Sequence, residues 1–190
     1  MTFKIVPWTE ELDRTLTSFY AEAGRRGFTN NASRRMLVDS IARENEWAVW
    51  ILYYDDKAVG SVAAHSFPEM GENCYRIAAR TCVFTDMLPG VYGSALRTKS
   101  VITEHQNPTA QFLIPACLQW TPRESRVFIT SNESEVGTQR RVHNIFGPLL
   151  ERQGTMKRAA DIHYRGTNQT AWEFFPDVFL KQINQYPRWQ

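Results

Sequence analysis

The sequence of 190 residues is 43% hydrophobic and 22% charged, a balance that is typical of a folded globular protein and excludes wholesale disorder. Its 22 basic and 20 acidic side chains leave a net charge of +2, so nothing in the charge balance favours nucleic acid or an anionic membrane as the main partner. The longest apolar run, Trp47–Tyr54, is far shorter than the roughly 20 residues that span a bilayer, and no membrane segment is predicted.

The first part of the chain predicts a strand followed by two helices. The strand covers residues 3–6 and ends at Pro7, and Thr9 is suited to cap the helix that follows. Gly24 and Gly27 are predicted to stop that helix, and Arg25 and Arg26 suit its C-terminus. A second helix is predicted to begin at a cap among residues 30–33 and to bury one face of residues 36–41. The predicted buried face of the first helix consists of Leu12, Leu16, Phe19, Tyr20 and Ala23.

Three strands are predicted next, at residues 46–54, 58–67 and 74–85. A turn at residues 55–57 joins the first two strands, and a loop at residues 68–73 leads to the third. Because both connections are short, the three strands should form an antiparallel meander. Strict alternation along the third strand would place Arg76 and Arg80 on the same face of the sheet.

The second half of the chain predicts a crossover unit and a final hairpin. Residues 89–108 are polar and irregular, and a loop of that length in a compact domain is usually functional or mobile. The predicted elements that follow are a helix at 109–120 with a kink at Pro115, a strand at 126–130, a helix at 136–152, strands at 156–164 and 169–175 around a turn at 165–168, and a short tail at 179–190.

The predicted order of elements is therefore β-α-α-β-β-β-α-β-α-β-β, in a single domain that covers residues 1–190. This order predicts an α+β fold, an α/β sandwich in which a mixed sheet of about seven strands carries helices on both faces.

The cysteines and histidines indicate in which cellular compartment the protein is expected and whether it binds a metal ion. The three cysteines, Cys74, Cys82 and Cys117, cannot all pair, and none forms a C-x-x-C couple. Residues 1–7 lack the long apolar segment of a secretory signal. We therefore expect reduced thiols and a cytoplasmic location. The four histidines are scattered without the spacing of zinc ligands, so no metal site is expected.

The order of elements resembles that of the GNAT superfamily of N-acetyltransferases, and several short segments agree with it. The segments are YYDDKAVGSVAAH (53–65) for the second and third strands, RIAARTCVFTD (76–86) for the fourth strand, GSAL (93–96) for the pyrophosphate loop, VFITSNE (127–133) for the fifth strand and HYRGTNQTAWEFF (163–175) for the last hairpin. The resemblance implies that the fourth strand carries a bulge and then diverges from the fifth. The cleft between them would take the arm of an acyl-CoA.

Cofactor contacts implied by the resemblance lie in the fourth strand and the loop after it. Val83 and Phe84 would pair with the pantetheine arm, and Gly90, Gly93 and Ser94 would face the pyrophosphate at a helix N-terminus. The pyrophosphate motif is incomplete, which is typical of a divergent branch. The two glycines are equally compatible with ordinary turns.

Three further residues follow from the same comparison. Asn132 would either hydrogen-bond the pantetheine arm or cap the helix after it. The position where the family often has a catalytic tyrosine holds Leu150, which cannot donate a proton. His143 is then the remaining acid–base candidate, although a lone histidine on an amphipathic helix is also typical of a packing or surface residue.

Charged residues on the fourth strand allow two interpretations, because a buried charge is costly unless it is paired. Arg76 and Arg80 could form an anion site in the cleft, with Arg80 as a substrate-binding residue. Alternatively they form an internal ion pair with Asp86, Glu46 or Glu173.

The function implied by the resemblance is N-acyl transfer from acetyl-CoA or another acyl-CoA to an amine on a small molecule or a peptide. The alternative is a GNAT-shaped protein that has lost catalysis and binds a small molecule or a protein partner. Neither interpretation includes nucleic acid or a membrane as a partner, and both are compatible with a homodimer.

Overall fold

The computed structural model describes residues 2–25, 46–82, 108–132 and 147–185, and of residues 79–82 it describes the backbone alone. Seven strands form one sheet in the order β1-β2-β3-β4-β5-β7-β6. β4 and β5 run parallel, and every other neighbouring pair is antiparallel, so the mixed sheet is as predicted. The strands are β1 Phe3–Pro7, β2 Trp47–Tyr54, β3 Lys57–Ser66, β4 Cys74–Cys82, β5 Arg126–Ser131, β6 Met156–Tyr164 and β7 Thr167–Phe174.

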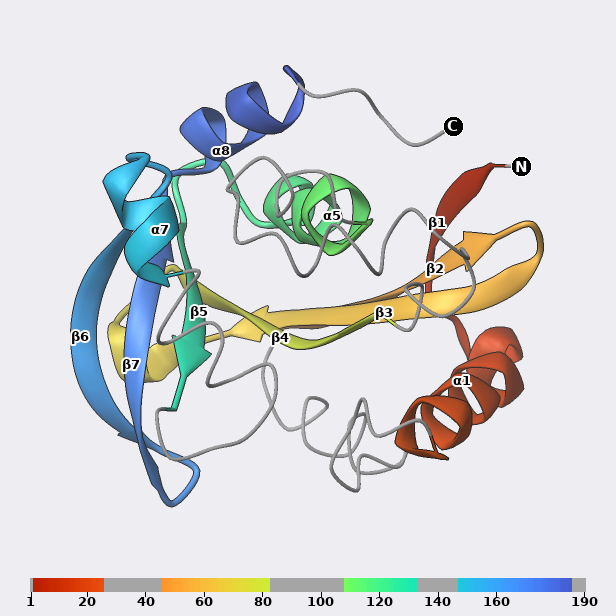
Figure 1. Cartoon of the computed structure of the whole chain (residues 1–190). Coiled ribbons are helices and arrows are strands. Elements are labelled where there is room, and N and C mark those ends of the chain that lie inside the picture. The colour runs from red at the N-terminus through yellow and green to blue at the C-terminus, as the bar shows by residue number, and fades with distance from the viewer. Residues whose placement is uncertain (1, 26–45, 83–107, 133–146, 186–190) are drawn as a thin grey trace.

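Helices cover both faces of the sheet, again as predicted (Figure 1). α1 (Asp13–Arg25), which follows a 3-10 turn at Glu10–Leu12, lies on one face. α5 (Ile114–Trp120), α7 (Gly147–Arg152) and α8 (Pro176–Ile183) lie on the other. The two sides are named the α1 face and the α5 face below.

Alternation along the strands divides the apolar side chains between these faces. The α5 face carries the larger core, in which strand residues such as Leu52, Ile77 and Ile129 pack with Leu113 and Cys117. The α1 face carries a smaller cluster that contains most of the predicted helical face. Its buried members are Leu16, Phe19, Tyr20, Ala23, Val49, Ile51 and Ala63.

Two tight turns differ from the sequence expectation in length. Asp55 and Asp56 both have positive φ, 43° and 63°, and β3 begins directly after them at Lys57. Arg165 and Gly166 have φ of 51° and 77°, so β7 begins at Thr167 and the predicted turn at 165–168 is two residues too long. Two-residue turns with positive φ match the twist of a hairpin, which explains their use here.

The predicted helix at 109–120 is divided by Pro115. A π-helical turn covers Thr109–Leu113, and regular α-helix begins only at Ile114. Pro115 has no N–H to donate to the carbonyl of Gln111, so the α-helical bonding pattern cannot run through this point. The wider π turn accommodates the missing bond.

The end of the chain was predicted as a tail and is instead the helix α8. Pro176 stands at its first turn, where the missing N–H has no cost. Phe179 and Ile183, one turn apart, are 1% and 2% exposed, and the Phe179 ring lies 5.3 Å from that of Phe174. Eight residues are too few to give a clear helical period in sequence, which is why the pattern missed this element.

Several predicted elements lie outside the described residues. They include the second helix at 36–41, the end of the fourth strand at 83–85, and the irregular segment up to residue 107. Of the predicted helix at 136–152, the described part is Gly147–Arg152.

Replacement of Phe179, the most buried side chain of α8, should test how much this helix contributes to the stability of the core. Phe179→Ala should lower the free energy of unfolding by about 3–5 kcal/mol, the usual cost of emptying a buried phenylalanine site. Val178→Ala is the matched control, because Val178 is 41% exposed and its loss should cost less than about 0.5 kcal/mol. Urea unfolding of both variants makes the measurement. Equal stabilities would show that α8 is not part of the folded core.

Candidate functional site

β4 and β5 separate soon after they begin to pair. Their parallel ladder joins Cys74 to Arg126, Tyr75 to Val127 and Arg76 to Phe128, and it ends there within the described residues. β4 nevertheless continues to Cys82, and β5 continues to Ser131. The divergence expected from the resemblance is therefore confirmed.

Each strand follows its outer neighbour beyond this point. β4 stays with β3 as far as the pair of Gly60 and Cys82, whereas β5 stays with β7 as far as the pair of Ser131 and Thr170. Figure 1 shows the consequence: β5, β7 and β6 run steeply across the direction of β2, β3 and β4. The sheet therefore divides into two arms, and the region between their separated edges is where the resemblance places the acyl-CoA cleft.

A bulge interrupts β4 at the start of its separated part. Ser61 of β3 faces Thr81, but Ala63 faces Ala78, so β4 carries one residue more than β3 over this interval. The bulge is the one that the resemblance implied. The bulge lies between Ala78 and Thr81, so it interrupts the strict alternation from which a shared face for Arg76 and Arg80 was predicted. The side chain of Arg80 is outside the described part of the structure, and its orientation stays a prediction.

Arg76 occupies the last position at which β4 pairs with β5, and the residue is 9% exposed. Its Nε and Nη2 donate to Oγ1 of Thr130 at 3.0 and 2.8 Å. Its guanidinium carbon also lies 4.8 Å from the centre of the Tyr164 ring. Three strands, β4, β5 and β6, therefore meet at this one side chain.

The carboxylates predicted as partners of Arg76 are bound elsewhere. Glu173 accepts hydrogen bonds from Arg126 at 2.7 and 2.9 Å and lies 3.1 Å from Lys157, and the bonds from Arg126 hold the pKa of its carboxyl below the usual range. Glu46 accepts a hydrogen bond from the Tyr75 hydroxyl, which raises the pKa of Tyr75 to about 12. The third candidate, Asp86, lies outside the described residues.

His65, on β3, completes this cluster. Its Nδ1 donates to the Ser66 carbonyl at 2.6 Å, because a carbonyl can only accept. Burial, together with the nearby charge of Arg76, lowers its pKa to about 4, so the ring is neutral at pH 7. Neutral Nε2 then accepts from Nη1 of Arg76 at 3.4 Å. With that lone pair engaged, His65 is a support for Arg76 and not a free base.

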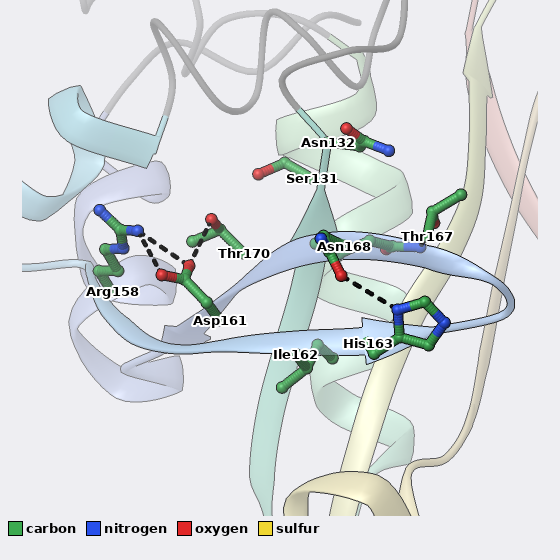
Figure 2. A pocket seen from close by; sticks show the side chains of 10 residues that line it. Ser131, Asn132, Arg158, Asp161, Ile162, His163, Thr167, Asn168 and Thr170 are labelled. Carbon is green, nitrogen blue, oxygen red and sulfur yellow. Dashed lines mark hydrogen bonds and ion pairs between the residues drawn. The ribbon is translucent and has the colours of Figure 1, made fainter.

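A polar pocket of about 1070 Å³ lies beside the end of β5, at the β6–β7 hairpin (Figure 2). Asp161 accepts from Nη2 of Arg158 at 2.8 and 2.7 Å and from Oγ1 of Thr170 at 2.8 Å. Nearer the turn, Nδ1 of His163 and Oδ1 of Asn168 are 3.0 Å apart. The pocket is lined by Ser131, Asn132, Arg158, Asp161, Ile162, His163, Thr167, Asn168, Gln169 and Thr170.

Of the site residues predicted from sequence, the structure places Asn132 at this pocket. It follows β5 directly and is 8% exposed. Arg80 lies in the bulged part of β4, where the backbone alone is described. The other candidates, Val83, Phe84, Gly90, Gly93, Ser94 and His143, lie outside the described residues.

Thr130, Asp161 and Thr170 were not among the site residues predicted from the sequence. The pairing of Asp161 with Thr170 follows from the strand register once the turn is placed at Arg165 and Gly166. A correct turn length would therefore have predicted that these two side chains are neighbours. Thr130 had no local signal, because its role depends on an arginine far away in the sequence.

Two further expectations concern metals and membranes. Among the described residues there is no group of three or more His, Cys, Asp or Glu side chains placed to hold a metal ion. None of the helices in the described ranges has the length and apolar character needed to cross a bilayer.

His65 should make the protein less stable in mild acid. Its pKa is about 4 when folded and about 6.5 when unfolded, so above pH 6.5 it is neutral in both states. Between pH 6.5 and 4 the unfolded chain takes up a proton that the folded protein does not, and the free energy of unfolding should fall by about 3 kcal/mol. Urea unfolding from pH 4.5 to 7.5 measures the slope.

His65→Gln keeps a hydrogen-bonding side chain without the titration, so it should flatten that slope. Glu173, whose carboxyl has a lowered pKa in the folded protein, adds to the loss of stability near the acid end of this range. Its contribution is common to the variant and the wild type, so it cancels when the two slopes are compared. Parallel pH profiles of the variant and the wild type would contradict the assignment of a neutral, buried His65.

The fold and its cleft were compared with known proteins. No family model and no curated protein matches the chain. Among solved structures, the aminoglycoside acetyltransferase AAC(6')-Ib in complex with paromomycin and acetyl-CoA has a TM-score of 0.56 at 10% identity, over 95% of this chain and 97% of that one. Spermidine N-acetyltransferase from Vibrio cholerae, in complex with CoA and spermine, has a TM-score of 0.51 at 11% identity, over 94% of this chain and 98% of the other.

A GNAT-family acetyltransferase from Staphylococcus aureus Mu50 has a TM-score of 0.51 at 7% identity, over 90% of this chain and 99% of the other. Identities this low carry no information about substrates, but the likeness extends over nearly the whole of each chain. The chain therefore has the fold of the GNAT acetyltransferases.

Proposed function

We propose that this protein is an acyl-CoA-dependent N-acyltransferase that moves an acetyl group from acetyl-CoA to the amine of a small molecule. The observation that carries the proposal is the separation of β4 from β5 after the pair of Arg76 and Phe128. A sheet that served only as a scaffold would gain stability by continuing this ladder, because buried backbone groups need hydrogen-bond partners.

The chemistry of an acyl-CoA fits this cleft. Its pantetheine arm is extended and contains two amides, so it can be paired along a strand edge as an added strand would be. The inner edge of β4 beyond Arg76 is not covered by β5. We assign the arm to this edge, with Val83 and Phe84 as its continuation and Asn132 as a hydrogen-bond partner from β5. Gly90, Gly93 and Ser94 remain the candidates for the pyrophosphate.

Acetyl-CoA supplies an acyl group that is activated as a thioester. The protein must then position the amine, keep water away and accept the proton that the amine loses. His65 is excluded as the proton acceptor because Arg76 already donates to its Nε2. His143 remains the candidate for that role.

The hairpin pocket is the proposed acceptor site, because it includes Asn132 at the cleft end of β5. Its one described carboxylate, Asp161, is balanced by Arg158. The remaining lining is mostly hydroxyl and amide groups. Such a lining suits a polar amine of low charge better than a polycation, which would need several carboxylates. The neighbours bound to paromomycin and to spermine support an amine acceptor in general.

Calorimetric titration with acetyl-CoA and with free CoA tests the proposal directly. We expect saturable binding of both in the micromolar range, and release of free thiol when a panel of hydroxylated amines is added. Absence of binding at millimolar acetyl-CoA would refute the proposal and favour a GNAT-fold protein that binds another molecule without catalysis.

Asn132→Ala separates the two roles predicted for this residue. If Asn132 bonds the pantetheine arm, the KM for acetyl-CoA should rise about tenfold, the effect of losing one good hydrogen bond, with little change in melting temperature. If it only caps a helix, the melting temperature should fall and the KM should not change. Asn184→Ala is the control, because Asn184 is exposed at the end of α8 and should affect neither quantity.

A further inference from the structure

The side chain of Arg76 connects the two arms of the sheet at the place where their backbones separate. Arg76 is the last residue of β4 that pairs with β5, and its partner there is Phe128. Thr130 lies two residues further along β5, beyond the end of the ladder, and it receives both hydrogen bonds, at 3.0 and 2.8 Å. The guanidinium thus continues the link between β4 and β5 after the backbone link has ended.

The surroundings of Arg76 fix its position. His65 accepts from Nη1 on the β3 side at 3.4 Å, and the Tyr164 ring of β6 lies against the guanidinium at 4.8 Å. Thr130 is fully buried, and His65 is 1% exposed. Hydrogen bonds from a charged donor in such a dry environment are stronger than those between neutral groups. A side chain held on three sides has little freedom to let its partner move.

This contact has a mechanical consequence for β5. Among the described residues, β5 pairs beyond Phe128 with β7 alone. The two hydrogen bonds from Arg76 to Thr130 tie β5 to β4 just past the end of their ladder. Asn132 follows Thr130 by two residues, so any movement of Thr130 also displaces Asn132.

We infer that Arg76 is a positioning residue which, through Thr130, sets the angle at which β5 leaves β4 and so the width of the cleft. The inference rests on the proposed function for what the cleft binds. It assigns no chemical step to Arg76, which acts through β5 and Asn132.

Two substitutions of Thr130 test the inference with minimal change in shape. Thr130→Val replaces the accepting hydroxyl by a methyl group, and Thr130→Ser keeps the hydroxyl. We expect Thr130→Val to weaken acetyl-CoA binding about tenfold and Thr130→Ser to stay within about threefold of the wild type. Equal affinities in the two variants would overturn the inference.

Thr155→Val is the matched control. Thr155 is also fully buried, and its hydroxyl donates a hydrogen bond to the Leu150 carbonyl at 3.0 Å. It lies directly before β6, away from the cleft. It should lose stability much as Thr130→Val does, but its acetyl-CoA affinity should stay within about twofold of the wild type. Equal weakening of binding in both valine variants would show a general effect of stability and contradict the positioning role.

We call the hydrogen-bonded contact between Arg76 and Thr130 the brace. Hydrogen exchange without ligand tests the brace independently of the proposed function. Peptides that contain residues 129–132 should exchange faster in Thr130→Val than in the wild type, and at the wild-type rate in Thr155→Val. Unchanged exchange in Thr130→Val would refute the brace. Faster exchange together with no acyl-CoA binding by the wild type would support the brace and refute the proposed function, so the two failures are distinguishable.

Arg76→Lys adds a test of geometry. Lysine keeps the charge but cannot make two bonds from a planar group to Thr130 while a third donor reaches His65. It should therefore behave like Thr130→Val in both measurements, and wild-type behaviour would contradict the inference.

Discussion

Beyond Arg76 and Phe128, the described parts of β4 and β5 are each paired with their outer neighbour and not with one another. β7 pairs with β5 from Val127 to Ser131, and β3 pairs with β4 as far as Cys82. Each strand is therefore stabilised on its outer edge by a partner that bends away from the other arm. The twist of a sheet accumulates from strand to strand, and here the two arms diverge instead of sharing it. The cost is a stretch of inner edge in which the two strands cannot satisfy one another.

The distribution of buried polar groups follows from this opening. On the α5 face the strands contribute a continuous apolar core from Leu52 to Trp172. On the α1 face, next to the cleft, the buried residues Ser61, His65, Arg76 and Thr130 are polar. Burying such groups is unfavourable unless they bond to one another, as three of them do. Local violations of core composition of this kind are typical of functional regions, which agrees with a cleft that serves binding.

Strand positions were predictable because apolar runs between turn signals are a local property. β6 begins and ends at the predicted residues, and the other strand ends that lie within the described ranges agree to within about two residues. The errors have separate causes. The helix α8 is too short to show a period, and the turn at Arg165 and Gly166 is tighter than its composition suggested.

The candidate site was less predictable, because its contacts join residues that are distant in sequence. Arg76 and Thr130 are 54 positions apart, and the bulge between Ala78 and Thr81 has no signature in a single sequence. The residues implied by the resemblance, from Val83 to Ser94 and His143, depend on segments outside the described ranges and remain predictions. Asn132 lines the hairpin pocket directly after β5, a strand whose end the pattern located well, and its contact with an acyl-CoA stays a prediction.

The low identity to the acetyltransferase structures is understandable if the acyl-CoA site is mainly a feature of the backbone. A strand edge exposed by divergence can bind an amide-containing arm whatever the side chains on that strand, so the sequence there can vary while the cleft persists. The same argument explains how an incomplete pyrophosphate motif is compatible with binding, since any residue with the right backbone conformation can donate its N–H. Under the proposed function, selectivity for the acceptor would depend on side chains of the hairpin pocket. The balanced pair of Arg158 and Asp161 and the amide and hydroxyl groups around it would then favour an acceptor of low charge. On this proposal the acyl-CoA cleft and the acceptor pocket could change independently in evolution, with Asn132 contributing to both.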